Sequence, residues 1–117
     1  MFECFYDEKK NLITIKYEKI VDVKDVRILY TTLQAMLPKC EKGFKLLADL
    51  SLVEIMEEDV LPLIKKVMDL CNRHGVSEVI RIIPDPDKDI GLNIMSFFHY
   101  SKDVKVVNCQ SLEQVRL

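Results

Sequence analysis

The chain has 117 residues, of which 49% are hydrophobic and 31% are charged. This composition predicts one folded domain over residues 1–117 and excludes a disordered tail. Seventeen basic and 19 acidic residues give a formal charge of −2, which provides no cationic field for a nucleic-acid partner. The apolar runs are shorter than the about 20 residues of a membrane span, and the first residues do not read as a secretory signal. We therefore expect a cytoplasmic protein without a membrane span.

The first half of the chain predicts two strands, a helix and a third strand. Apolar residues alternate on both sides of a polar turn between Phe2 and Tyr17, which predicts a β-hairpin. Asp22 and Asp25 have the spacing of a capping box, and apolar residues then recur at helical spacing over 23–37. The segment 44–50 is short and almost wholly apolar, as expected for a central strand that is covered on both faces.

The second half of the chain predicts two further strands and three helical segments. The acidic run Glu57, Glu58 and Asp59 opens a helix that starts no earlier than about residue 58, because Pro62 is tolerated only near a first turn. This helix ends at Gly75. The remaining elements are a strand at 78–83, a helix at about 89–99, a strand at 104–109, and a terminal helical turn at 112–117 with Ser111 as its N-cap.

The resulting order, ββαβαβαβα, predicts an α/β fold with a mostly parallel sheet of about five strands and an N-terminal β-hairpin. Function in such sheets gathers at the carboxyl ends of the strands, here at 49–59 and 84–89. Asp49 and Ser51 follow the apolar strand directly, so their carboxylate and hydroxyl are candidates to face a ligand or partner. The alternative is that both satisfy local hydrogen bonds of a turn.

No catalytic residue can be assigned. An aspartate such as Asp49 is what a phospho-accepting receiver domain uses, but that chemistry also needs an acidic pair after the first strand and a lysine after the last. Here a hairpin opens the chain, and residues 109–111 are Cys-Gln-Ser. With three glycines in the chain, neither a P-loop nor a dinucleotide-binding fingerprint can be built. We therefore expect no enzymatic activity and no cofactor.

No metal site is predicted either. Residues 85–89 alternate aspartate as a calcium loop does, but the glycine comes one position late and Ser96 replaces the bidentate glutamate. His74 and His99 have no neighbouring ligand at metal-binding spacing. The four cysteines form no Cys-x-x-Cys pair, and in a reducing compartment we expect them to be small buried hydrophobic residues.

The segment from Leu47 to Asp59 combines Asp-Leu-Ser, an alternating apolar stretch up to Met56, and the acidic run. It resembles the signature of STAS domains, named for sulfate transporters and anti-sigma-factor antagonists, and the predicted order of elements is similar to their fold. In that family, Asp-Ser-Ser/Thr-Gly opens the helix, and the resemblance places Glu58 at the serine that a kinase partner phosphorylates. Glu58 cannot accept phosphate. The acids then imply either a permanently charged binding face or only a favourable helix start.

Two functions follow from these observations. The first is a non-enzymatic regulatory domain that resembles an anti-sigma-factor antagonist and presents Asp49, Ser51 and Glu57–Asp59 to a protein partner, a regulator or an anti-sigma-like kinase. Such a domain would be a monomer or a homodimer. The second is a small-molecule-binding or lipid-binding domain of the STAS or Sec14 type. Its candidate pocket would be lined by side chains of the predicted helix at 89–99: Met95, Phe97 and Phe98.

Overall fold

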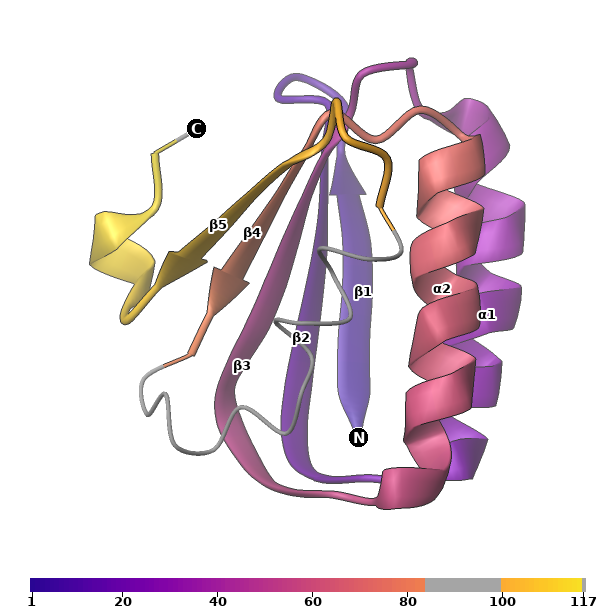
Figure 1. Ribbon diagram of the computed structural model, residues 1–117, viewed down its shortest axis with the longest axis vertical. Helices are drawn as coiled ribbons and strands as arrows, with labels where there is room; N and C mark the ends of the chain where they lie inside the picture. Colours follow the sequence, from indigo (N-terminus) through magenta and orange to yellow (C-terminus); the bar gives the residue numbers. More distant parts are fainter. Residues whose placement is uncertain (84–99, 117) are drawn as a thin grey trace.

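The computed structural model describes residues 1–83 and 100–116. They contain a five-stranded sheet in which the strands lie side by side in chain order. β1 runs antiparallel to β2, and every other neighbouring pair is parallel (Figure 1). The predicted mostly parallel sheet with an N-terminal hairpin is confirmed. The strands are β1 (Phe2–Asp7), β2 (Leu12–Val21), β3 (Lys45–Met56), β4 (Glu78–Ile82) and β5 (Lys105–Cys109).

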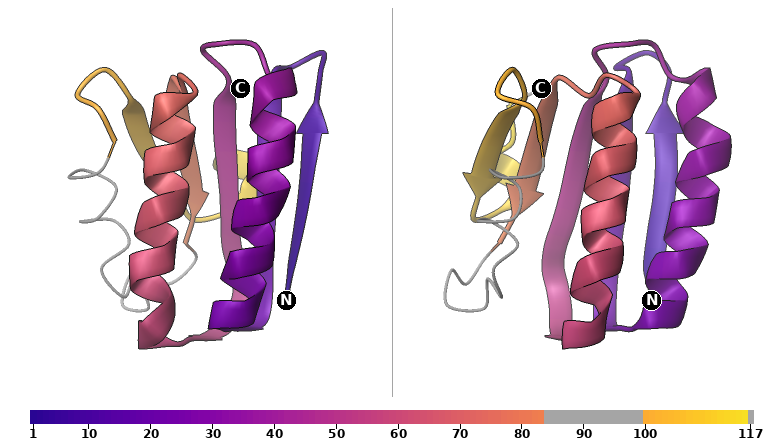
Figure 2. Two further views of the ribbon diagram at one scale, coloured as in Figure 1. Left: turned by 90° about the vertical axis from the view of Figure 1, so that its right-hand side faces the viewer. Right: turned by 45° about the vertical axis from the view of Figure 1, so that its right-hand side comes forward.

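Two helices of the described residues, α1 (Val23–Met36) and α2 (Leu61–Arg73), lie side by side on one face of the sheet (Figures 1 and 2). Short 3-10 turns follow α1 at Leu37–Lys39 and precede α2 at Glu58–Val60. Pro62 stands in the first turn of α2, where a missing N–H costs no hydrogen bond. Both helices were expected from the apolar periodicity of the sequence.

The main core lies between these helices and the sheet. It forms because alternate residues of each strand point to one face, while helical residues three and four apart share a stripe. Phe44, directly before β3, is the largest fully buried side chain of the described residues and has an exposure of 0%. Other fully buried members come from β2, α1 and the turn after it: Ile13, Ile15, Leu29, Leu33 and Leu37.

A second, smaller core covers part of the opposite face of the sheet. Its buried residues are Leu12, Leu47, Ile80, Ile82 and Cys109, against which Val115 packs. The chain reaches this face after β5 through a 3-10 turn at Leu112–Gln114. The longer helical turn expected at 112–117 is therefore wrong in extent. Ser111 occupies the N-cap position but makes no capping bond. The turn has a different side-chain bond: the side-chain oxygen of Gln114 accepts a 2.7 Å bond from the backbone N–H of Gln110.

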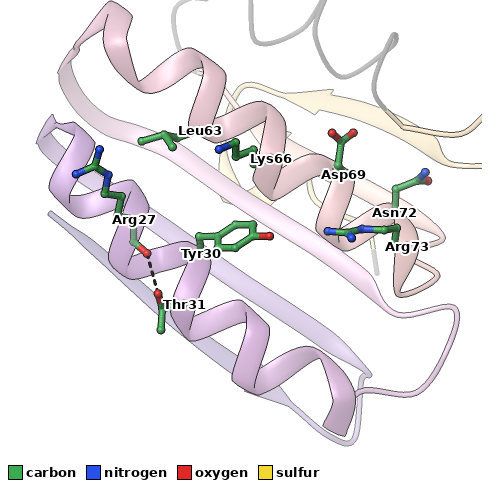
Figure 3. Close-up of a pocket in the computed structure, with 8 residues that line it drawn as sticks. All are labelled: Arg27, Tyr30, Thr31, Leu63, Lys66, Asp69, Asn72 and Arg73. Carbon is green, nitrogen blue, oxygen red and sulfur yellow. Dashed lines mark hydrogen bonds between the residues drawn. The ribbon is translucent and has the colours of Figure 1, made fainter.

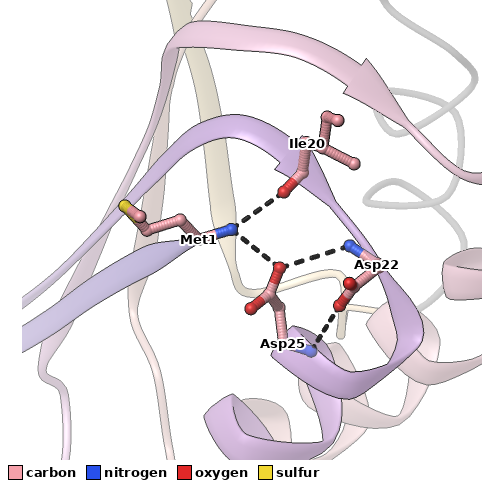
Figure 4. A network of polar contacts seen from close by, with 4 residues as sticks. All are labelled: Met1, Ile20, Asp22 and Asp25. Carbon is pink, nitrogen blue, oxygen red and sulfur yellow. Dashed lines mark hydrogen bonds and ion pairs between the residues drawn. The ribbon is translucent and has the colours of Figure 1, made fainter.

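The start of α1 is fixed by a network of polar contacts (Figure 4). The side chain of Asp22 accepts a 2.8 Å hydrogen bond from the backbone N–H of Asp25, and the reciprocal contact of the predicted capping box is present. The Met1 ammonium donates to the carboxylate of Asp25 at 2.7 Å and to the carbonyl of Ile20 at 2.8 Å. Burial alone would raise the pKa of Asp25, but its hydrogen bonds to Met1 and Asp22 hold it below the usual value.

We expect Asp22→Ala to lower the free energy of unfolding by about 1 kcal/mol, because the first turn of α1 loses its side-chain acceptor. Asp22→Asn is the matched control, since asparagine caps helices about as well as aspartate. Urea denaturation of the three proteins measures the difference. Equal stability of the alanine and asparagine variants would contradict a capping role for Asp22.

The predicted helix at 89–99 and the predicted loop at 84–89 lie outside the described residues. Within those that are described, no helix is long and apolar enough to cross a membrane.

Candidate functional site

β3 is longer than the sequence indicated. The expected strand at 44–50 instead continues to Met56, because it stays paired with a β2 that itself extends past Tyr17 to Val21. The register advances unevenly along this extension: three residues of β2 (16–18) face four of β3 (49–52), and one further residue of β3 is added before Ile55. Both irregularities are β-bulges, which bend a strand and re-aim its side chains. We call residues 16–21 and 49–56 together the β2–β3 ribbon.

Asp49 and Ser51 lie at the first bulge and not at a strand end. An oxygen of the Asp49 carboxylate accepts a 2.9 Å hydrogen bond from the backbone N–H of Ser51. The local hydrogen bond that was the alternative to a ligand-facing role for Asp49 is therefore present. It gives an acceptor to the N–H of Ser51, a residue that the bulge leaves without a partner in the β2–β3 register. The expectation that Asp49 marks the carboxyl end of β3 is wrong, because the strand closes its ladder with β2 only at Met56.

The acidic run (Glu57, Glu58 and Asp59) does follow the carboxyl end of β3. All three side chains are exposed. The backbone N–H of Glu57 donates to the carbonyl of Val21 at 3.2 Å, and that of Val60 donates to the carbonyl of Glu57 at 3.1 Å. Val60 is fully buried in the main core. Its packing holds the turn against the core, while the three carboxylates before it face solvent.

The structure separates the two halves of the predicted site. Asp49 and Ser51 are at the start of the β2–β3 ribbon, and the acidic run is at its far end. At about 3.3 Å per residue, on the order of 20 Å of strand lies between them. The sequence analysis predicted one site from these residues because it ended the strand at residue 50 and not at Met56.

Three aliphatic residues of the β2–β3 ribbon are exposed, and sequence reasoning missed them. Ile20 is 50% exposed, Leu52 is 51% exposed and Ile55 is 56% exposed. Ile20 pairs directly with Ile55, and Leu52 pairs with Glu18 two pairs back along the ladder, so the three residues lie in one short stretch of the ribbon. We call them the aliphatic patch. The signal was available in the β-branched residues of 18–21 and 52–56, which indicate that both strands continue.

A small, partly open cavity of about 40 Å³ lies between the sheet and α2, and it is lined by Tyr17, Arg81 and Tyr100 among apolar residues. Arg81 is 3% exposed. Burial raises the pKa of Tyr17 and that of Tyr100. Pockets for metabolites usually enclose about 300–1,000 Å³, so this cavity suits water. The candidate pocket residues Met95, Phe97 and Phe98 lie outside the described residues, and their role stays a prediction.

Burial favours the protonated form of three thiols, those of Cys4, Cys40 and Cys71. Cys71 and Cys109 are buried as expected, whereas Cys4 and Cys40 are half-buried. Burial raises the pKa of Cys4 to about 11 and that of Cys71 to about 12. In the described part of the chain, no group of three or more His, Cys, Asp or Glu side chains could hold a metal ion; the aspartates of 85–89 are not in that part.

The strand order, the antiparallel first strand and the two helices on one face define the fold of the SpoIIAA-like anti-sigma factor antagonists, the STAS fold to which the sequence pointed. The unphosphorylated form of the anti-sigma factor antagonist SpoIIAA matches with a TM-score of 0.66 and 11% identity, over 97% of this chain and 92% of that chain. The expected fold is confirmed.

Two further solved structures share it. An uncharacterized protein of the DUF3478 family from Shewanella loihica, described as having a SpoIIAA-like fold, gives a TM-score of 0.72 at 9% identity over 97% of this chain and 87% of that chain. An anti-sigma factor antagonist from Mycobacterium paratuberculosis gives 0.60 at 13% identity over 97% and 89%. No family model matches the sequence, and no curated protein matches it.

Proposed function

We propose that this chain is a non-enzymatic, cytoplasmic regulatory domain that binds a protein partner in the manner of an anti-sigma factor antagonist. The partner contacts the aliphatic patch and the acidic run, with Asp49 and Ser51 at the border of the contact. The observation that carries the proposal is the aliphatic patch, because three aliphatic side chains about half exposed in one short stretch of a strand ribbon are unusual unless something covers them.

The charges beside the aliphatic patch support a protein as the occupant. Protein interfaces combine an apolar centre with a polar or charged rim, and the exposed carboxylates of Glu54, Glu57 and Glu58 lie at the same end of the ribbon. Charge at a rim selects the partner and speeds its approach. The partner surface is accordingly apolar with a basic border.

The proposed interaction has no phosphorylation switch at Glu58. The neighbour SpoIIAA is described in an unphosphorylated form, and the STAS resemblance aligns Glu58 with the serine that is phosphorylated in that family. A carboxylate already carries part of the charge of a phosphoserine and accepts no phosphoryl group. Binding would therefore be governed by the amounts of the two proteins and not by a kinase acting at this residue.

The test begins with affinity capture and identification of a partner, which is then purified and titrated against the chain by calorimetry. We expect Glu58→Lys to abolish measurable binding and Leu52→Asp to weaken it by about tenfold or more, as burying a charge in an apolar interface centre does. Leu112→Asp and Glu113→Lys are matched controls, because both residues are exposed in the C-terminal 3-10 turn beyond β5. Unchanged binding by both the Glu58 and the Leu52 variants, or equal loss in the controls, would refute this site.

A further inference from the structure

A second concave surface lies on the outer side of the helices. The α1–α2 groove has a volume of about 910 Å³ and receives Arg27 and Tyr30 from α1 and Lys66 and Arg73 from α2 (Figure 3). Its size is that of pockets that hold ligands or peptide segments. It belongs to the helix layer, whereas the aliphatic patch belongs to the β2–β3 ribbon.

The charge of this layer is opposite to that of the chain. α1 and α2 together carry five basic and two acidic side chains, although acids outnumber bases in the whole sequence. One of the two acids, Asp25, is paired with the Met1 ammonium at 2.7 Å. Among the described residues, no ion pair within 4.0 Å involves Arg27, Lys66 or Arg73. Three cations thus line one groove in which, among the described residues, Asp69 supplies a single carboxylate.

The positions of these cations favour an elongated ligand. Lys66 and Arg73 are two helical turns apart on α2, a rise of about 10 Å, and Arg27 lies across the groove near Leu63 (Figure 3). Acidic residues at positions i, i+3 or i+4, and i+7 of a helix cover the same span on one face. The ring of Tyr30 and the side chain of Leu63 add apolar surface in the groove, which suits the apolar edge of an amphipathic helix.

We propose that the α1–α2 groove docks an acidic amphipathic helix of a protein partner, whose carboxylates bind Arg27, Lys66 and Arg73. Among the residues that the structure describes, Asp69 is the one carboxylate that lines the groove, and it opposes such a ligand. We therefore expect Asp69→Asn to increase the affinity of the groove for an acidic helix, and reversal of the charge of the cations to decrease it. This inference is independent of the partner that the aliphatic patch binds.

The experiment uses a fluorescein-labelled helical peptide with glutamates on one face and leucines on the other, titrated by fluorescence anisotropy. We expect Arg27→Glu with Arg73→Glu to weaken binding by about tenfold or more, Asp69→Asn to strengthen it, and added salt to weaken it. Lys45→Glu with Lys105→Glu is the matched control, because both lysines lie in the register row of Leu12 on the opposite face of the sheet. Amide shift mapping with labelled protein locates the contact.

Several results would overturn the inference. One is a peptide affinity that the Arg27 and Arg73 reversal does not change, provided that circular dichroism shows the variant folded. Another is shift changes that fall outside α1 and α2. A third is binding of inorganic tripolyphosphate, or of phosphatidylserine vesicles, at the groove without binding of the peptide, which would assign the groove to a small anion or to a membrane surface.

Discussion

Replacing Phe44 with alanine is expected to lower the free energy of unfolding by about 3–5 kcal/mol, the usual range for an aromatic residue removed from a core. Phe44 is 0% exposed and is the largest fully buried side chain in the part of the chain that the structure describes. It stands between the 3-10 turn after α1 and the first residue of β3, and its carbonyl accepts a 2.8 Å bond from the backbone N–H of Ser77 just before β4. Its removal leaves a cavity where these segments meet. Guanidinium denaturation measures the loss.

Phe5→Ala is the matched control for this prediction. Phe5 is the same residue type, but it lies on β1 with 53% exposure, so its removal uncovers little core. We expect a change within about 1 kcal/mol. If both substitutions lowered the free energy of unfolding by a similar amount, burial in the main core would not explain how much either ring contributes to stability.

Stability is expected to fall steeply as the pH rises from about 9 to about 12. Burial raises the pKa of Cys71 to about 12 from the ordinary thiol value of 9.0, and it also raises the pKa of Tyr17 and Tyr100. Each of these groups is neutral when protonated, and the unfolded chain ionises first. The stabilisation is therefore complete below about pH 9 and is lost as the pH approaches the folded-state pKa. By pH 11, Cys71 alone accounts for a loss on the order of 3 kcal/mol in the free energy of unfolding.

Cys71→Ala separates this thiol from the other groups that titrate at high pH. The variant loses some packing at every pH, but we expect its free energy of unfolding to decline less between pH 8 and pH 11 than that of the parent chain. Denaturant titrations at a series of pH values give both curves. Parallel curves would mean that the Cys71 thiol does not contribute to alkaline unfolding.

Local patterns were enough to predict most elements of the fold. The capping box of Asp22 and Asp25 marked the start of α1, and Pro62 bounded the start of α2, because each signal acts within a few residues of its own position. The end of β3 needed information from another segment. Its last residues remain a strand because Glu18 to Val21 pair with them, and the β-branched residues of 52–56 alone do not say how far the partner strand extends.

The candidate site was predictable in part for the same reason. The acidic run was found because helix starts favour acids, and the structure places it at a strand end. The aliphatic patch was missed because the exposure of Ile55 depends on the bulge before it and on what packs nearby. The burial of Arg81 was missed as well, since alternation within β4 does not say which face of the sheet the helices cover.

The molecule carries opposite charges at two places along α2: the basic α1–α2 groove and the acidic run that precedes the helix. A charged protein that diffuses toward it would experience a torque before any contact forms, and the encounter would be biased toward one orientation. Such steering acts within about 8 Å at physiological ionic strength. Salt should therefore change the rate of association of a partner more than its rate of dissociation.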